Sequence, residues 1–332
     1  MTSLDKETGR DRYFAAKERE LDELIDPATG LVSERFARTI PCPLCDSAPV
    51  AHVELFVKRG FPIVRCTDCE LVFANPQVDE SLVLDEYRAG SERANDLWVD
   101  VLTSERQLEL DREKFTEILD ELDPYRGEGR LLDVGTSIGL FLRLALDRGW
   151  DAVGNEFGAR ARTVAQDRFG LDVSGEPLAE MGLEPASFDV VTLNSVLEHV
   201  NAPREMLGEI GGLLKPGGAL SVIVPNVESL ACRVLHERAA TFDGRNHLSY
   251  FSSRTLARML DSAGFDVVEL HTRIASLEPV LEHLTYREPY GERAPADDPL
   301  VAGARARRGE LERVLEQLHL GYKLHCLARR RS

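Results

Sequence analysis

The sequence predicts an α/β protein with a mostly parallel sheet that is covered by helices on both faces. Three observations lead to this fold class. After residue 129, apolar strand-like runs alternate with helical patterns, and this alternation is typical of sheets built from β-α-β units. The strand-like runs are apolar throughout, as expected of strands buried on both faces. A glycine-rich turn after the first of these strands lets a ligand approach the backbone closely.

The elements of this part follow one another in a regular order. Strands are expected at the segments RLLDVG, DAVGNE, FDVVTLN and ALSVIVPN. A helix is expected after each of them, and the first three helices end near Arg148, Phe169 and Leu214. Residues 126–332 are therefore predicted to form one large domain, with an insertion at about 273–318 that carries no motif.

The first 125 residues divide into three segments of different character. Residues 1–38 are predicted to form a helical arm, residues 39–78 a small module of short strands and turns, and residues 79–125 an acidic helical linker or cover. Four aromatic residues of the arm and the linker are candidates for a cover over an active site, with ordinary packing as the alternative: Tyr13, Phe14, Tyr87 and Trp98.

The composition limits the classes of function. The 332 residues carry a formal net charge of −17, which disfavours nucleic acid as a partner because phosphate backbones are bound through Lys and Arg. No stretch approaches the roughly 20 apolar residues that a membrane-spanning helix needs, and the N-terminus lacks the apolar core of a secretory signal. We therefore expect a cytoplasmic protein with no membrane partner, whose oligomeric state the sequence leaves open.

Four of the six cysteines have the spacing of a metal site. Cys42 and Cys45 form one C-x2-C pair, and Cys66 and Cys69 form a second pair after twenty intervening residues. Two such pairs hold one Zn²⁺ ion tetrahedrally, and four thiolates leave no position for a catalytic water. The pattern predicts a structural zinc ion that stabilises a module too small to fold on its core alone. A redox pair or unrelated buried cysteines are the alternatives.

The glycine-rich turn has an acidic residue in front of it. Asp133 precedes Gly135, Ser137 and Gly139, and a carboxylate at this position suits a cationic or amino-bearing ligand better than a pyrophosphate. The next strand ends in Glu156, about twenty residues after the glycines, where a carboxylate can accept both hydroxyls of a ribose.

Five motifs in this order resemble the class I S-adenosylmethionine-dependent methyltransferase family: LLDVGTSIG, VGNE, SFDVVTLNSVLEHV, LLKPGGALSVIVPN and HLSYFSSRTLARMLDSAGF. The resemblance implies a Rossmann-like core of seven strands with an antiparallel last strand, and S-adenosylmethionine as cofactor. The N-terminal half looks like that of bacterial sugar- and natural-product-modifying methyltransferases with an N-terminal zinc domain, which include deoxysugar C-methyltransferases. A small-molecule acceptor is therefore expected.

The resemblance also implies roles for single residues. It places the methionine part of the cofactor beside Asp133, Gly135 and Gly139, and the ribose beside Glu156. It places the adenine near the segment from Glu176 to Leu178 and lines the cofactor with Asn194 and Ser195. Ser137 replaces the middle glycine of the family's usual motif, so either an additional hydrogen bond or a degenerate site is expected there.

Two histidines are candidates for the base that removes a proton from the acceptor. His199 follows the FDVVTLN strand, and His247 precedes the LSYFS segment; both have side chains that titrate near neutral pH. For His199 a structural role beneath the cofactor is the alternative. Some relatives hold a metal with E-x-x-E-H, but Ser195 stands at the first glutamate, so a catalytic magnesium is not expected.

Three functions remain in competition. Methyl transfer to a small molecule, such as a sugar, a nucleotide sugar or a secondary metabolite, is favoured, with O-methylation ahead of N- and C-methylation. An RNA methyltransferase that holds RNA with the zinc module is the first alternative, and a non-catalytic cofactor-binding protein is the second.

Overall fold

The computed structural model describes residues 8–79, 81–82, 93–274, 276–284 and 298–331, so Tyr87 of the expected aromatic cover lies outside the described residues. Its largest element is a six-stranded sheet in the order β11-β12-β9-β8-β6-β7. The strands of this sheet are β6 (Arg130–Val134), β7 (Asp151–Asn155), β8 (Phe188–Asn194), β9 (Leu214–Pro225), β11 (Phe265–Arg273) and β12 (Lys323–Arg330).

The sheet confirms the predicted fold class. Strands β7, β6, β8 and β9 pair in parallel, whereas the last strand, β12, runs antiparallel to both β9 and β11. The described residues supply six strands rather than the expected seven. At the outer edge a single parallel bridge joins Asn155 to Ser174. Gly175 and Pro177 follow at once, and both residue types weaken strand pairing, so this edge does not extend into a strand.

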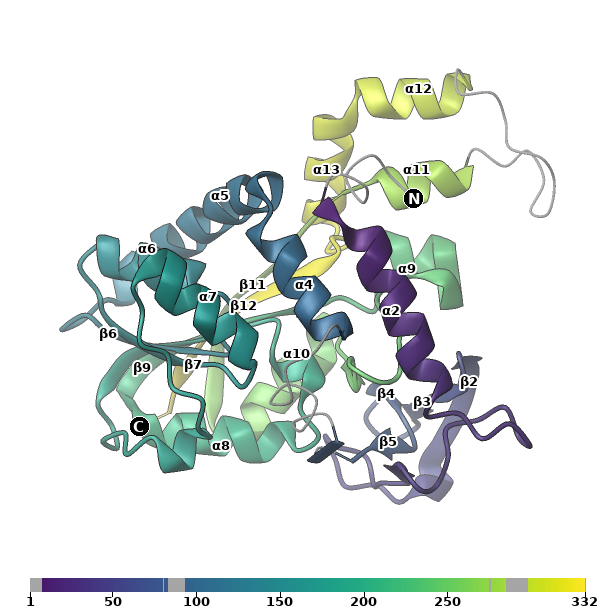
Figure 1. The fold of residues 1–332 in the computed structure, drawn as a ribbon, viewed down its shortest axis with the longest axis horizontal. Helices are drawn as coiled ribbons and strands as arrows, with labels where there is room; N and C mark the ends of the chain where they lie inside the picture. Colours follow the sequence, from purple (N-terminus) through teal and green to yellow (C-terminus); the bar gives the residue numbers. More distant parts are fainter. Residues whose placement is uncertain (1–7, 80, 83–92, 275, 285–297, 332) are drawn as a thin grey trace.

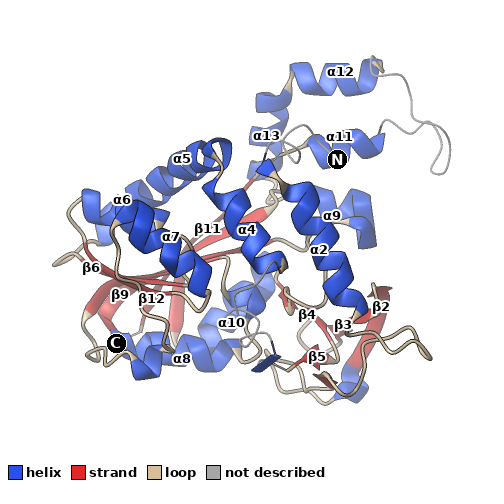
Figure 2. Ribbon diagram, viewed as in Figure 1, coloured by secondary structure: helices blue, strands red, loops and turns tan. Residues whose placement is uncertain are grey.

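Helices cover both faces of the sheet (Figure 1, Figure 2). One face packs against α5 (Glu105–Leu122), α6 (Leu140–Asp147) and α7 (Ala159–Phe169), and the other against α8 (Pro203–Leu213) and α10 (Ser253–Ser262). The residues of β6 and β8 are almost all buried, as is the second half of β9, whereas most of β11 is exposed or half-buried. Burial on both faces explains why these central strands are apolar throughout instead of alternating.

The cysteine-containing module forms a second sheet that the large domain completes. Strands β2 (His52–Lys58), β3 (Phe61–Cys66) and β4 (Val72–Ala74) are antiparallel neighbours, and β10 (Ser249–Tyr250) pairs with β4. A separate two-stranded ladder joins β1 (Ala37–Arg38) to β5 (Gln77–Val78). Phe73 and Leu71 of the module lie in the same apolar core as Leu256 and Met259 of α10. The module therefore folds onto the large domain.

Two further groups of helices lie outside the main layers. Helices α2 (Arg10–Asp22) and α4 (Ala94–Thr103) pack against each other above the sheet edge. Helix α9 (Leu230–Leu235) follows β9, and the connection between β11 and β12 carries α11 (Glu278–Leu284), α12 (Pro299–Ala306) and α13 (Arg308–Gln317), which project from the body in Figure 1. None of the described helices is long and apolar enough to cross a membrane.

Candidate active site

The carboxyl ends of the parallel strands bring the predicted polar residues to one edge of the sheet. Asp133 lies near the end of β6 with only 2% of its surface exposed. Its Oδ1 accepts hydrogen bonds from Thr192 Oγ1 at 2.6 Å and from Asn194 Nδ2 at 3.4 Å. Burial raises the pKa of Asp133 to about 6, although these hydrogen bonds oppose the shift. A buried carboxyl with so few partners is well placed to receive a cationic group.

The turn after β6 has the backbone that its glycines permit. Gly135 and Gly139 have φ angles of 69° and 82°. A Cβ atom on Gly135 would lie 2.8 Å from Val196 Cγ2, and one on Gly139 would lie 2.7 Å from Leu171 Cδ1. Ser137 also adopts the left-handed region, with φ 53°. The replacement of the middle glycine therefore leaves the turn in the conformation of a glycine, at the cost of backbone strain.

Glu156 closes the turn from the neighbouring strand. Its Oε2 accepts the Ser137 N–H at 3.0 Å, and its Oε1 accepts the Gly158 N–H at 2.7 Å. Burial raises the pKa of Glu156, and both backbone hydrogen bonds oppose the shift. Each carboxylate oxygen keeps acceptor capacity for a hydroxyl group, because an oxygen of this kind has about two acceptor sites.

Asn155, which the sequence interpretation missed, connects the turn to the segment after the Ser174 bridge. Its Oδ1 accepts the Gly135 N–H at 3.3 Å, and its Nδ2 donates to the carbonyl of Glu176 at 3.1 Å. The Glu176 side chain is exposed, whereas Leu178 is buried. The expected adenine segment thus reaches this edge through its backbone and through Leu178, since the Glu176 carboxylate points to solvent.

Asn194 and Ser195 complete the edge at the end of β8. The Oδ1 of Asn194 is buried and has no hydrogen-bond partner among the described residues, which is the kind of buried polar atom that a ligand satisfies. Ser195 has a φ of 61°, and its Oγ accepts a hydrogen bond from Lys323 Nζ at 2.9 Å. Lys323 comes from the distant strand β12 and carries no motif, so sequence reasoning did not find it.

The two predicted histidines lie side by side just beyond β8. Their ring centroids are 4.9 Å apart. The Nδ1 of His199 lies 2.8 Å from the carbonyl oxygen of Asn246, and the Nδ1 of His247 lies 2.8 Å from that of Thr241. Because a carbonyl only accepts, both Nδ1 atoms carry a proton, and in a neutral ring of this tautomer Nε2 is the acceptor. Burial lowers the pKa of His199 to about 4.

A buried acidic side chain lies beside this pair. The Glu198 side chain is completely buried, and neither of its oxygens has a hydrogen-bond partner among the described residues. Its Oε1 lies 4.0 Å from His199 Nε2 and 3.7 Å from Lys323 Nζ. Ligand atoms of Glu198, His199 and His247 lie within 4.8 Å of one another and could hold a cation. The basic Lys323 already lies next to Glu198, although burial lowers the pKa of its amino group.

The helical arm reaches the loop that carries His247. Asp243 Oδ1 accepts the backbone N–H groups of residues 245–247 at 2.7–3.0 Å. Its other oxygen pairs with Lys17 Nζ of α2 at 2.7 Å, and both side chains are largely buried. This pairing lowers the pKa of Asp243 despite its burial. Helix α2 therefore fixes the His247 loop, a contact that spans more than 200 residues of sequence and has no local signal.

The aromatic side chains of the arm pack beside this contact. The rings of Tyr13 and Trp98 have centroids 5.0 Å apart, and those of Tyr13 and Phe14 are 5.2 Å apart. Phe14 is 43% exposed. Tyr13 and Trp98 thus join α2 to α4.

The four cysteines converge on the module. Cys42 Sγ lies 3.4 Å from Cys69 Sγ, and Cys45 Sγ lies 3.6 Å from Cys66 Sγ. All four sulfur atoms lie within 4.8 Å of one another. Burial raises the pKa of Cys42, and the neighbouring Cys69 thiol adds to the shift. Ionisation of four cysteines packed this closely in a core is unfavourable, because the thiolates repel one another. A divalent cation between them would offset this negative charge.

Comparison with known proteins identifies relatives of the large domain. The sequence model of a family described as a methyltransferase domain matches residues 104–270, just over half of the chain. A ubiquinone biosynthesis O-methyltransferase of Paracidovorax citrulli is 36% identical over 109 residues, which cover 30% of this chain and 44% of that protein. One from Idiomarina loihiensis is 29% identical over 156 residues, covering 43% and 63%. The chain therefore spans less than two thirds of the length of these curated relatives.

Solved structures give a more distant likeness. A SAM-dependent methyltransferase from Archaeoglobus fulgidus has 18% identity and a TM-score of 0.46, with 76% of this chain and all of that chain covered. The Burkholderia thailandensis 1,6-didemethyltoxoflavin-N1-methyltransferase, solved with 1,6-didemethyltoxoflavin and S-adenosylhomocysteine, has 17% identity and a TM-score of 0.45, with 80% and 97% covered. At these scores the likeness gives no information about the site or the acceptor.

Proposed function

Because this chain belongs to the family of S-adenosylmethionine-dependent methyltransferases, we propose that it methylates a hydroxyl oxygen of a small molecule and that His247 is the base. The observation that carries this proposal is the histidine pair. Two imidazoles, each fixed through Nδ1 by a backbone carbonyl, present free Nε2 atoms next to the buried Glu198. An alcohol is too weak a nucleophile to react with its proton in place, so a base of this kind is what O-methylation requires.

The residues at the sheet edge fit the cofactor. The buried carboxyl of Asp133 would face the amino group, Glu156 would accept the ribose hydroxyls, and the buried Asn194 Oδ1 would gain the donor that it lacks. Gly135, Ser137 and Gly139 would form the close backbone turn beside the methionine part, with Ser195 beside it. The Glu176 backbone and Leu178 would border the adenine. When bound, the cofactor supplies an electrophilic methyl group on a sulfonium and leaves as S-adenosylhomocysteine.

The two histidines take different roles. His199, whose pKa burial lowers to about 4, is a weak base at neutral pH. We therefore assign proton removal to His247 Nε2, while the acceptor oxygen forms its bond to the methyl carbon. His199 remains neutral and positions the second ring, and the buried Glu198 stabilises the positive charge that develops on His247. The chain's other contribution is alignment of donor and acceptor, which supplies much of the acceleration in a displacement reaction.

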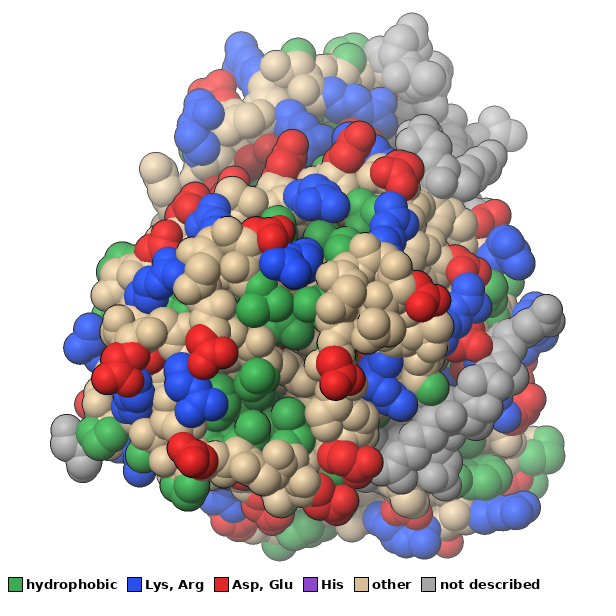
Figure 3. Space-filling view, turned by 60° about the vertical axis from the view of Figure 1, so that its left-hand side comes forward, with side chains coloured by type: hydrophobic (Ala, Val, Ile, Leu, Met, Phe, Trp, Pro, Cys, Tyr) green, Lys and Arg blue, Asp and Glu red, His purple; other side chains and the backbone are tan. Residues whose placement is uncertain are grey.

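Two observations support a small hydroxylated acceptor over RNA. The curated relatives are named for O-methylation in ubiquinone biosynthesis. The chain is strongly acidic, and on the face in Figure 3 basic and acidic side chains are interspersed. Binding of a phosphate backbone relies instead on clustered Lys and Arg.

A panel of acceptors tests this function. Phenols, sugars and nucleotide sugars are incubated with the protein and methyl-labelled S-adenosylmethionine. We expect labelled methyl ether from one class, and His247→Gln should lower kcat by about 100-fold, the order that general-base catalysis contributes. Affinity for S-adenosylhomocysteine should be unchanged. His319→Asn, which removes an exposed histidine, is the matched control.

The outcomes of this test separate the competing functions. Transfer of the labelled methyl group to RNA, with no transfer to the small molecules, would favour the RNA methyltransferase. Binding of the cofactor without transfer to any acceptor would favour a non-catalytic protein. Full activity of His247→Gln would remove this residue as the base.

We also propose that Cys42, Cys45, Cys66 and Cys69 hold a structural zinc ion. The sulfur separations between the two C-x2-C pairs, 3.4 Å for Cys42–Cys69 and 3.6 Å for Cys45–Cys66, suit four thiolates at about 2.3 Å from one ion. Elemental analysis of protein that has been dialysed to remove loosely held metal should find about one zinc per chain, and Cys69→Ser should lose this zinc and destabilise the module. Cys232→Ser, a buried cysteine outside the cluster, should keep the zinc. Folded, zinc-free wild-type protein would refute the assignment.

A further inference from the structure

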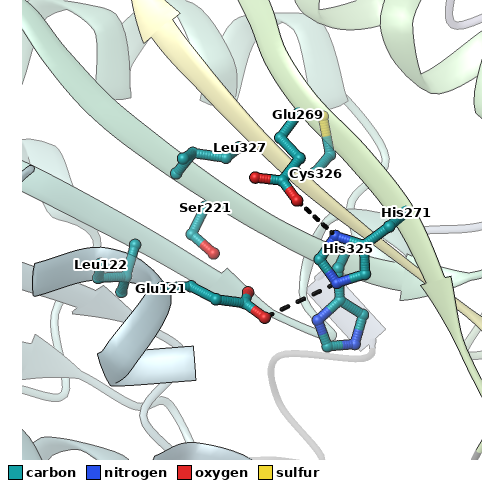
Figure 4. A pocket seen from close by; sticks show the side chains of 8 residues that line it. All are labelled: Glu121, Leu122, Ser221, Glu269, His271, His325, Cys326 and Leu327. Atoms are coloured by element: carbon teal, nitrogen blue, oxygen red, sulfur yellow. Dashed lines mark ion pairs between the residues drawn. The ribbon is translucent and has the colours of Figure 1, made fainter. Parts of the chain in front are cut away.

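A second group of metal-ligating side chains lies on the face of the sheet under α5. His271 of β11 and His325 of β12 are directly paired across the two antiparallel strands, so both side chains stand on the same face. Their ring centroids are 5.2 Å apart. Glu121, in the last turn of α5, points toward them from the helix (Figure 4). Together with Glu269 and Ser221 they line a small pocket.

His325 offers a ring nitrogen that the described residues leave without a partner, and a metal ion at His271 Nε2 would replace a hydrogen bond from Arg273. His325 is 94% buried, and its Nδ1 has no hydrogen-bond partner among the described residues. A buried ring nitrogen in this state is costly unless a ligand satisfies it. In His271, Nδ1 lies 3.5 Å from Glu269 and Nε2 accepts from Arg273 at 3.4 Å, so Nε2 is the unprotonated nitrogen.

The carboxylates around the pair complete the set of ligands. Glu121 Oε1 lies 3.8 Å from His271 Nε2, and ligand atoms of Glu121, His271 and His325 all lie within 4.8 Å of one another. Glu269, near Nδ1 on the opposite side of the ring, is placed like the carboxylates that orient metal-bound imidazoles. Arg273 forms ion pairs with both Glu121 and Glu117. Because Glu117 can keep Arg273 paired, Glu121 can turn one carboxylate oxygen toward a cation.

The remaining positive charges near the pocket have partners of their own. Lys114 pairs with Asp111 at 2.5 Å, and Lys323 contacts Ser195 and lies 3.7 Å from Glu198. A cation at this site would therefore compete mainly with Arg273, which contacts both Glu121 and His271.

We propose that Glu121, His271 and His325 form a binding site for a divalent transition-metal ion of the zinc type. Two imidazoles and one carboxylate suit such ions and do not suit Mg²⁺ or Ca²⁺, which prefer oxygen ligands. The ion joins α5 to β11 and β12, at the base of the connection that carries α11 to α13. This site is separate from the four cysteines and from the histidine pair of the proposed active site, and it does not depend on the proposed function.

Cobalt is the probe for this site, because its visible spectrum distinguishes nitrogen and oxygen ligands from thiolates. The full chain, with zinc retained on the cysteines and loosely held metal removed by dialysis, is titrated with Co²⁺. We expect a saturable d–d absorption without thiolate charge transfer, and an increase in Tm on binding. His271→Gln and Glu121→Gln should each weaken this binding by at least about tenfold.

Control variants locate the ion. His319→Asn removes an exposed histidine, and His247→Gln removes one histidine of the cluster with Glu198 and His199. Both variants should still bind the one Co²⁺ ion per chain that His271→Gln no longer binds. Because the His271 side chain is partly exposed, its replacement should leave the far-UV circular dichroism unchanged. Co²⁺ binding that is equal in wild type and His271→Gln, or that only His247→Gln abolishes, would overturn the proposal.

Discussion

Asp133, which we propose to bind the amino group of the cofactor, should give cofactor binding a pH dependence that can be calculated. Burial raises its pKa to about 6 in the free protein. A cationic amino group beside the carboxyl favours the ionised form and lowers this pKa in the complex. Binding then releases a proton at acidic pH, so affinity is greatest above pH 6 and decreases as the pH is lowered through 6.

The size of the effect follows from the ionised fraction of Asp133. With a pKa of about 6, about 90% of the carboxyl is ionised at pH 7 and about 9% at pH 5. If only the ionised form binds well, the Kd of S-adenosylhomocysteine should increase about tenfold between pH 7 and pH 5, or about 1.4 kcal/mol. Asp133→Asn should bind more weakly at pH 7 and should lose most of this dependence.

Isothermal titration calorimetry at both pH values, in buffers of different ionisation enthalpy, measures the Kd and the protons released. Asp167→Asn, which removes an exposed carboxyl, is the matched control and should keep the wild-type dependence. Glu156 has a raised pKa as well. The pH dependence of the Kd that remains in Asp133→Asn therefore reports the contribution of Glu156. An equal Kd at the two pH values in the wild type, or an undiminished dependence in Asp133→Asn, would refute the role of Asp133.

The remaining predictions concern stability. Ser137→Gly should raise the free energy of urea unfolding by about 1 kcal/mol, because it removes the strain of a serine in the left-handed region. Gly139→Ala should lower this free energy, because the added methyl group would contact Leu171. Urea midpoints of both variants equal to that of the wild type would exclude strain at the turn. Lys17→Met should cost about 3 kcal/mol, because it leaves the buried Asp243 unpaired, and should lower kcat through the His247 loop. A loss below 0.5 kcal/mol would show that the pair contributes little.

The fold and the cofactor edge could be predicted because their signals are local in the sequence. A continuous apolar run predicts a strand buried on both faces, and a polar residue at its end falls at the carboxyl edge of the sheet. Asp133, Glu156 and Asn194 were found in this way, and all three lie at that edge. The spacing of the cysteines similarly predicted the cluster of four sulfur atoms. The prediction of a seventh strand was wrong, because the pattern of apolar residues does not show how Gly175 and Pro177 limit strand pairing at the edge of the sheet.

Contacts between distant segments could not be predicted. Lys323 reaches Ser195 across 128 residues, and Lys17 reaches Asp243 across 226. Neither lysine belongs to a motif, and a charged residue on a helix or an edge strand is usually solvated. The pairing of His271 with His325 depends on the register of two strands that are separated by three helices. Register is set by packing and by the connection between strands, so the sequence does not reveal this cluster.

The most direct test of the central claim is calorimetric titration of S-adenosylhomocysteine into the wild type and Glu156→Gln at pH 7, with Glu209→Gln as a control that removes an exposed carboxyl of α8. We predict micromolar binding to the wild type and the control, and at least about tenfold weaker binding to Glu156→Gln, because charge-assisted hydrogen bonds to the ribose are lost. Absence of binding by the wild type, or equal binding by Glu156→Gln, would contradict the cofactor site proposed at this edge of the sheet.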